Sequence, residues 1–108
     1  MTLEVYRLAI ETLRLLRPLI AKIARHDPDL ARQLKKAGAS VALNTAEGSG
    51  ASGGSARNHF CIARGSARES IACLEVAEAY GYVEAEEIEP CVTRFDRIAR
   101  MLTGLIRR

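Results

Sequence analysis

A glycine-rich segment is the first feature of this sequence whose residue types could do chemistry. Residues 48–53 read GSGASG, which matches the G-x-G-x-x-G pattern of dinucleotide-binding loops. Such a loop needs a strand before the glycines, a helix after them and an acidic residue about 20 positions later. Here a helical pattern precedes the glycines, and no P-loop lysine follows them. We therefore predict no nucleotide cofactor, although the N–H groups that begin the next helix, beside Arg57, could hold a phosphate of a larger ligand.

Glu47 is the residue best suited by type to general acid–base catalysis. That role needs a second polar group in a cleft and a shifted pKa, and the sequence places no His, Cys or second carboxylate near it. Ser40, Asn44 and Glu47 instead share one strip at the edge of a helix's apolar stripe. We interpret Asn44 and Glu47 as a structural clamp, with Glu47 paired to Arg64, Arg68 or free N–H groups at the next helix start. A catalytic Glu47 is the alternative.

The cysteines and histidines lack the spacing of a metal or redox site. Cys61, Cys73 and Cys91 are odd in number and form no C-x-x-C pair, so we expect reduced thiols that act as small apolar side chains. His26 and His59 lie far apart in sequence, and we expect both to be exposed near helix ends. We predict neither a metal nor another cofactor.

The elements that must position these residues are four apolar stripes with the 3.6-residue period of a helix. The first helix is expected over residues 3–25, with a kink at Pro18. The second follows Asp27 as N-cap and Pro28 as first residue, and ends at Gly48. The expected inward residues are Tyr6, Ala9, Leu13, Leu16, Ile20 and Ile23, followed by Leu30, Leu34, Ala37, Val41 and Thr45.

The third and fourth helices follow the glycine-rich segment. Ser55 is the candidate cap of the third, Gly81 its terminator, and Pro90 lies within the first turns of the fourth. The expected inward residues are Phe60, Ala63, Ala67, Ile71 and Leu74, followed by Ile88, Val92, Phe95, Ala99, Leu102 and Ile106. No window alternates as a strand does. We predict an all-α fold, an antiparallel up-down-up-down four-helix bundle, formed as one domain over residues 1–108.

Several sequence elements together resemble a known family. They are the Asn44-x-Ala46-Glu47-Gly48 motif, Gly65-Ser66, and the Tyr80-Gly81-Tyr82 ending of the third helix. The pattern resembles the four-helix-bundle proteins encoded by intervening sequences of bacterial large-subunit rRNA genes, and covers nearly the whole chain. That family is in turn similar to accessory proteins of diversity-generating retroelements, whose basic rings bind nucleic acid and a reverse transcriptase. The resemblance implies a homo-oligomer, a pentamer in the family, and no enzymatic activity.

The third helix has two surface features that suggest a contact with another subunit. Gly65, Ser66 and Ala67, with Ala63 and Ala72, form a surface of small side chains suited to close helix approach. Ile62, Cys73, Val76 and Tyr80 project away from the expected core line. We interpret this extra apolar face as an oligomer interface; coverage by a neighbouring helix is the alternative.

Charge is unevenly distributed along the chain, whose 108 residues carry a formal charge of +3. The segment from Glu69 to Glu89 has seven glutamates and no Lys or Arg, whereas the C-terminal segment is rich in arginine. In an antiparallel bundle these segments lie at opposite ends, so we predict an electrically bipolar monomer. The macrodipole of the last helix explains part of this pattern without any ligand.

The basic end leads to a functional hypothesis. We expect Arg57, Arg64, Arg97, Arg100, Arg107 and Arg108 to contact phosphates of RNA or DNA, repeated around a ring. The leading hypothesis is a non-enzymatic, oligomeric scaffold or adaptor that binds nucleic acid, structured RNA in particular. The alternative is a protein–protein adaptor with no nucleic-acid role. Since the sequence shows neither a basic-then-apolar leader nor an apolar run of about 18 residues, we expect a soluble, cytoplasmic protein without membrane contact.

Overall fold

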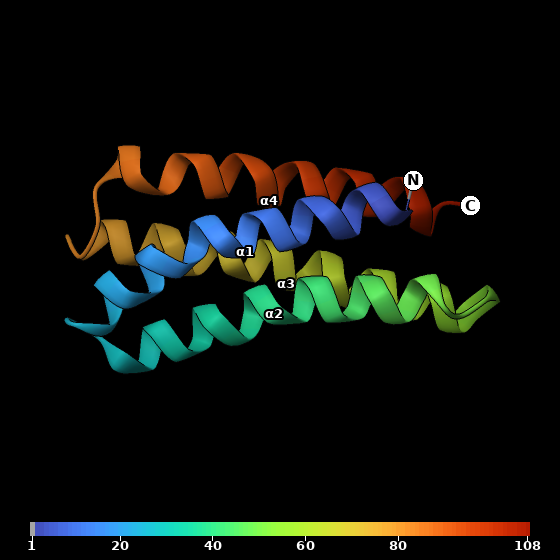
Figure 1. Ribbon diagram of the computed structural model, residues 1–108, viewed down its shortest axis with the longest axis horizontal. Coiled ribbons are helices and arrows are strands. Elements are labelled where there is room, and N and C mark those ends of the chain that lie inside the picture. The colour runs from blue at the N-terminus through green and yellow to red at the C-terminus, as the bar shows by residue number, and fades with distance from the viewer. Residues whose placement is uncertain (1) are drawn as a thin grey trace.

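Four α-helices make up the computed structural model, which describes residues 2–108 except for the side chain of Thr2. They are α1 (Thr2–Ala24), α2 (Pro28–Ser49), α3 (Gly53–Ala79) and α4 (Ala85–Ile106). Successive helices run in alternating directions, and both chain ends lie at the end where α2 turns into α3 (Figure 1). No strand occurs among the described residues. The predicted all-α four-helix bundle is confirmed.

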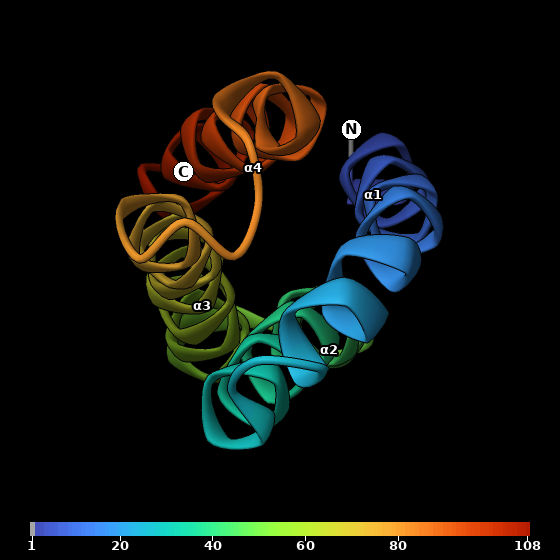
Figure 2. The same cartoon turned by 90° about the vertical axis from the view of Figure 1, so that its left-hand side faces the viewer.

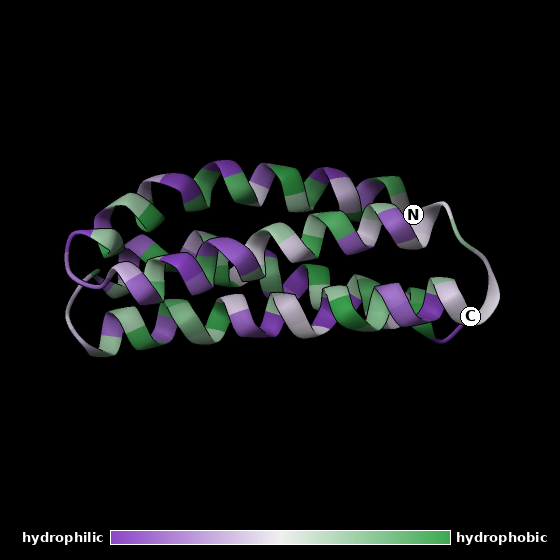
Figure 3. Ribbon diagram, turned by 90° about the horizontal axis from the view of Figure 1, so that it is seen from below, coloured by the Kyte–Doolittle hydropathy of each residue, from purple (hydrophilic) through white to green (hydrophobic). Residues whose placement is uncertain are grey.

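The helices surround one shared core. Viewed end-on, α1 lies beside α2 and α4, while α3 closes the other side against the same two helices (Figure 2). The body measures 42 × 22 × 19 Å, which is the elongated shape expected of helices packed nearly side by side. Hydrophobic and hydrophilic residues alternate along each ribbon (Figure 3), because each helix turns one stripe inward.

The helix ends follow local capping chemistry, with two corrections. The Asp27 carboxylate accepts a hydrogen bond from the Leu30 N–H at 3.0 Å, so Asp27 is the N-cap as predicted. Gly81 follows α3 with φ of 78°, a conformation that favours glycine. However, α2 continues to Ser49, and α3 begins at Gly53 rather than after Ser55. Helix α3 thus includes glycines of the glycine-rich segment. The packing of Ala56 against the core accounts for this early start.

The core is built from the predicted stripes, but α1 and α4 are rotated slightly from expectation. Phe95, Leu16, Leu34 and Leu74 are fully buried, as predicted. The corrections concern residues at the stripe edges. Tyr6 is 36% exposed, and Leu13, Ile20, Leu30, Ile71, Val92 and Ile106 are only partly buried. Their places in the core are taken by Val5, Thr12, Leu19, Cys91, Ile98 and Leu105.

Thr12 lies in the core, although it was not among the residues expected to face inward. Its hydroxyl donates to the Leu8 carbonyl oxygen at 2.6 Å, which satisfies the group without a partner from another helix.

Pro18 lies inside α1, which continues past it without interruption. The last, light-blue turns of α1 swing toward α2 in Figure 2, consistent with the predicted bend.

The cysteines differ in exposure. Cys73 and Cys91 are buried, and burial raises the pKa of the Cys91 thiol to about 11. Cys61 is exposed, so the expectation of an apolar setting is wrong for this residue. Burial also contradicts the prediction that Cys73 projects away from the core. Within residues 2–108, no three His, Cys, Asp or Glu side chains are grouped as metal ligands, and no helix is both long and apolar enough to cross a bilayer.

The end of the bundle formed by the α1–α2 and α3–α4 turns is held by polar contacts. Lys22 Nζ donates to Glu87 Oε1 at 2.7 Å, and the Glu84 N–H donates to the same oxygen at 2.8 Å. These donors hold the pKa of Glu87 below its usual value. Tyr82 stacks on the His26 ring and its hydroxyl donates to Asp27 at 3.4 Å, so the two turns contact each other directly.

The lowered pKa of Glu87 makes its contribution to stability depend on pH. A carboxylate whose pKa is lower when folded stabilises the protein above its unfolded pKa, and this contribution is lost as pH falls through the folded value. We expect Glu87→Gln to be less stable than wild type at pH 7, with the difference shrinking below about pH 4.5. Urea unfolding from pH 7 to pH 3 measures this. Glu86→Gln, in the same first turn, is the control and should show a smaller pH-dependent difference.

Candidate functional site

Asn44 of the predicted clamp belongs to a hydrogen-bonded chain of polar side chains between α2 and α3. Asn44 Nδ2 donates to the carbonyl oxygen and hydroxyl of Ser40, at 3.1 and 3.0 Å. The Ser66 hydroxyl donates to the Ser40 hydroxyl at 2.7 Å. Asn44 Oδ1 lies 3.0 Å from His59 Nδ1, and an amide oxygen only accepts, so His59 carries its hydrogen on Nδ1. Two contacts therefore cross from α2 to α3.

His59 is the member of this chain that sequence reasoning missed. It was expected to be exposed near a helix end, but it is partly buried within α3 and bonded to Asn44. A signal was present in the spacing. Asn44 and His59 lie equally far from the Ala51–Ser52 connection, and residues equidistant from a short connection face each other in an antiparallel helix pair.

Glu47 does not take part in the clamp. It is exposed, and within residues 2–108 it forms no ion pair with Arg64 or Arg68. The predicted pairing is therefore wrong, because α2 turns Glu47 toward solvent and leaves the corner to Asn44. An exposed carboxylate needs no partner to offset desolvation. Among residues 2–108 the Glu47 carboxylate makes no side-chain hydrogen bond or ion pair, so no partner for acid–base chemistry is bonded to it.

We therefore expect mutations of Asn44 and Glu47 to differ in their effect on the unfolding free energy. Asn44→Ala leaves His59 Nδ1 without its partner and removes the amide donor to Ser40, and we expect it to lower the unfolding free energy by about 1–2 kcal/mol. Glu47→Ala, one turn further on the same helix, is the matched control and should change it by less than about 0.5 kcal/mol. Urea denaturation of both variants decides this. Equal losses would mean that the polar chain does not hold the corner.

The two glycines of the motif have different surroundings. A Cβ atom at Gly48 would lie 2.4 Å from Phe60 Cε1, so this position allows α2 and α3 to approach closely. Gly65 is exposed and has open space around its would-be Cβ. The expectation that Gly65 serves close helix approach therefore does not hold within the bundle. Ser66 is buried and belongs to the polar chain.

Two of the six candidate phosphate-binding arginines meet at one hollow. Arg57 near the start of α3 and Arg108 after α4 line a space of about 240 Å³, together with Gly53, Phe60 and Leu105. The N-terminus of α3 lies at this hollow, where the helix dipole and free N–H groups favour an anion. Arg57, Arg108 and the N-terminus of α3 therefore bring positive potential to one hollow of the predicted interface.

The other four arginines lie along α3 and α4. Arg64 donates to the Thr103 hydroxyl at 3.2 Å, linking the two helices. Arg97 and Arg100 line a shallow hollow on α4, and Arg100 pairs with Asp96. Arg107 is exposed at the C-cap. The structure thus does not gather the six into one pocket; it places them along the α3–α4 side and at the glycine-rich end.

Charge is divided from side to side as well as from end to end. The Gln33 amide donates to Glu69 at 3.4 Å, which places the cationic first half of α2 level with the acidic half of α3. Lys22 faces Glu87 in the same way across α1 and α4. The prediction of an electrically bipolar monomer is therefore incomplete, because it omitted the cations that α1 and α2 bring to the acidic end. They are Arg17, Lys22, Arg25, Arg32, Lys35 and Lys36.

The chain is similar to known proteins in its fold and in its sequence profile. None of the curated proteins compared with the chain matches it. Among solved structures, a crystal structure at 1.70 Å of a protein of unknown function from the S23 ribosomal protein family of Bacteroides thetaiotaomicron is similar, with a TM-score of 0.86. The two chains are 21% identical over 96% of this chain and 99% of the other, which shows the shared fold. The sequence profile of the 23S rRNA-intervening sequence proteins matches residues 1–104, and the chain therefore belongs to the 23S rRNA-intervening sequence protein family.

Proposed function

We propose that this protein is a non-enzymatic, oligomeric scaffold that binds structured RNA in the cytoplasm through arginines of α3 and α4. The observation that carries the proposal is the hollow shared by Arg57 and Arg108 at the N-terminus of α3. Two guanidinium groups beside free helix N–H groups suit a phosphate, because each contributes positive potential and hydrogen-bond donors.

The ion pairing of the predicted arginines also supports an RNA-binding surface on α3 and α4. Among residues 2–108, Arg57, Arg97, Arg107 and Arg108 form no ion pair with a carboxylate, so their charges are available to a ligand. Arg64 and Arg100 already have partners within the bundle. The family's description refers to 23S rRNA intervening sequences, which makes structured RNA the first nucleic acid to test.

Self-association is part of the proposal because it would repeat the basic surface. Ile62, Val76 and Tyr80 of α3 are 43%, 42% and 69% exposed, which leaves apolar area for contact with another subunit. The family resemblance implies a ring of five. A ring would bring one basic end from each subunit to one rim, and phosphate binding strengthens with the number of cations engaged.

A protein–protein adaptor is the second candidate, favoured by the acidic side of the bundle. Tyr80 is exposed close to several glutamates of α3 and α4, and an exposed aromatic side chain within an acidic surface is a suitable anchor for a basic protein partner. On this alternative, the arginines serve solubility and helix-dipole stabilisation only.

Binding measured over a salt series tests the proposal. Fluorescence anisotropy with a labelled RNA hairpin and a DNA duplex, from about 50 to 200 mM salt, should show affinity falling steeply and log-linearly. Sedimentation velocity on the same samples reports whether the oligomer is intact. Absence of RNA and DNA binding at the lowest salt, with the oligomer present, would exclude the nucleic-acid role and favour the adaptor.

A further inference from the structure

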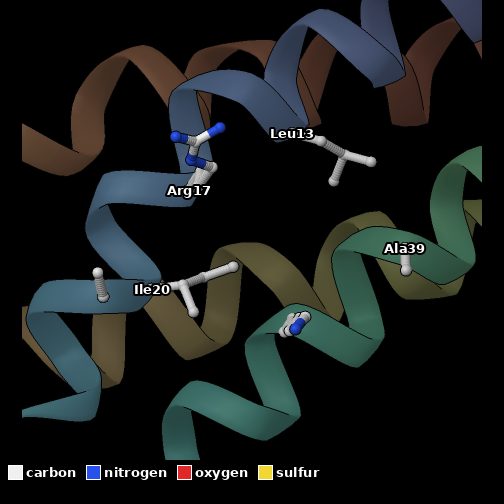
Figure 4. A pocket seen from close by; sticks show the side chains of 6 residues that line it. Leu13, Arg17, Ile20 and Ala39 are labelled. Carbon is white, nitrogen blue, oxygen red and sulfur yellow. The ribbon is translucent and has the colours of Figure 1, made fainter.

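An apolar groove with cationic edges runs along the outer side of α1 and α2. It encloses about 440 Å³ and is lined by Leu13, Arg17, Ile20 and Ala21 of α1 and by Lys35 and Ala39 of α2 (Figure 4). The lining is almost entirely hydrocarbon, and its two charged members, Arg17 and Lys35, are both cations. A matching surface would therefore be apolar and acidic.

A second apolar hollow lies nearer the glycine-rich end of the bundle. Gly38 lets α1 close on α2 locally, since a Cβ there would lie 2.9 Å from the Leu16 side chain. Beyond this contact, Leu3, Tyr6, Ala46 and Ser49 line a second hollow of about 430 Å³. Leu3 is 60% exposed in this hollow. Such a run of exposed apolar residues is unusual on a small bundle that works alone.

The chain carries one surface with the complementary character. On α3, Ile62, Val76 and Tyr80 are exposed, and the small residues Ala72 and Ala79 lie beside them. Glu69 and Glu75 lie on the same stretch of α3, and the one exposed Lys or Arg between Gly65 and Tyr80 is Arg68. We call Ile62, Val76, Tyr80, Ala72, Ala79, Glu69 and Glu75 the α3 strip. With two carboxylates against the neighbouring Arg68, its surface is apolar and net acidic, whereas the α1–α2 groove is apolar and cationic.

A single copy cannot join its own two surfaces. The α1–α2 groove and α3 lie on different sides of the bundle, with α1 and α3 diagonally placed in the end-on view (Figure 2). We propose that a second copy of this chain places its α3 strip in the α1–α2 groove. Because the two patches differ, the contact is heterologous and repeats head to tail, closing into a ring if the rotation permits. This inference rests on the oligomeric part of the proposed function and specifies the interface.

Charge reversal on each surface tests the pairing. Arg17→Glu with Lys35→Glu, and separately Glu69→Lys with Glu75→Lys, should each weaken self-association by about tenfold or more, because like charges then meet in the interface. All four side chains are exposed, so circular dichroism should show folded helices. Arg25→Glu, in the α1–α2 turn, with Lys36→Glu, on α2, makes the same change of charge outside the groove and should leave assembly unchanged.

Mixing the two reversed proteins gives the sharper result. Each has a reversed surface that matches the reversed surface of the other, and the two unreversed surfaces also match. An equimolar mixture should therefore associate again in sedimentation velocity, as should a chain carrying all four substitutions. Because the two reversed proteins must alternate around the ring, only rings with an even number of subunits can close. The mixture should therefore not form a five-membered ring.

The possible failures are distinguishable. A wild-type protein that stays monomeric at micromolar concentration would overturn both this interface and the oligomeric scaffold. An intact oligomer in the Arg17→Glu, Lys35→Glu protein would overturn the interface alone and leave the proposed function standing. If the Arg17→Glu, Lys35→Glu protein lost RNA binding but still assembled, the proposed interface would also be wrong, because Arg17 and Lys35 would then be phosphate contacts.

Discussion

Replacing Gly48 with valine is expected to lower the unfolding free energy by about 2–3 kcal/mol. A Cβ atom at this position would lie 2.4 Å from Cε1 and 2.7 Å from Cδ1 of Phe60, whose ring is 7% exposed. The ring is rigid and packed, so relief requires α2 and α3 to move apart where Asn44 and His59 join them. Urea unfolding measures the loss.

A matched control separates this clash from the general effect of valine in a helix. Gly104 also lies in the last turn of its helix, but a Cβ atom there meets nothing within 4 Å. We expect Gly104→Val to change the unfolding free energy by less than about 0.5 kcal/mol. Adding Phe60→Leu to Gly48→Val should cost less than the two single losses added together. Similar losses at both glycines would show that close approach at Gly48 is not the cause.

Neutralising the unpaired arginines is expected to remove most RNA binding. A variant with Arg57, Arg97, Arg107 and Arg108 changed to glutamine should bind an RNA hairpin about a hundredfold more weakly at low salt. The slope of log affinity against log salt should become shallower by about three, since each phosphate contact contributes about 0.7–0.9. Arg64 and Arg100 stay in place because Arg64 links α3 to α4 and Arg100 pairs with Asp96.

The control for this variant keeps the same net charge. Arg7, Arg14, Arg25 and Lys36 are exposed on α1, the α1–α2 turn and α2, away from the proposed interface. Their change to glutamine should leave the salt slope nearly unaltered. If both quadruple variants lose affinity equally, binding depends on total charge and the α3–α4 surface has no special part. Circular dichroism and sedimentation on both variants show whether fold and assembly are unchanged.

Local signals were sufficient for most of the helices. Asp27 and Pro28 start α2 because a carboxylate cap and a proline at the first position act within one turn of chain. Gly81 ends α3 because it alone of its neighbours adopts a left-handed φ there. The start of α3 was placed three residues late, since the glycine-rich segment has low helix propensity. Packing of Ala56 against the core outweighs that propensity.

Side-chain placement at the edges of the stripes was less predictable. Tyr6, expected to face inward, is 36% exposed, and Thr12 is buried, because a helix rotated slightly about its axis buries a different edge. Glu47 faces solvent and Cys73 faces the core for the same reason. Periodicity gives the angle of each side chain about its own helix, but not the rotation of that helix against its neighbours.

The sequence by itself determined the four helices, the N-cap of α2, the end of α3, the all-α class and the family, because each depends on residues close together along the chain or on the pattern of types. Only the tertiary structure decided that Asn44 meets His59, that Gly48 admits Phe60, and that the cations of α1 and α2 lie across from the glutamates of α3 and α4. These contacts join residues far apart in the chain. Their distances follow from the rotation and offset of packed helices, which the whole core sets jointly.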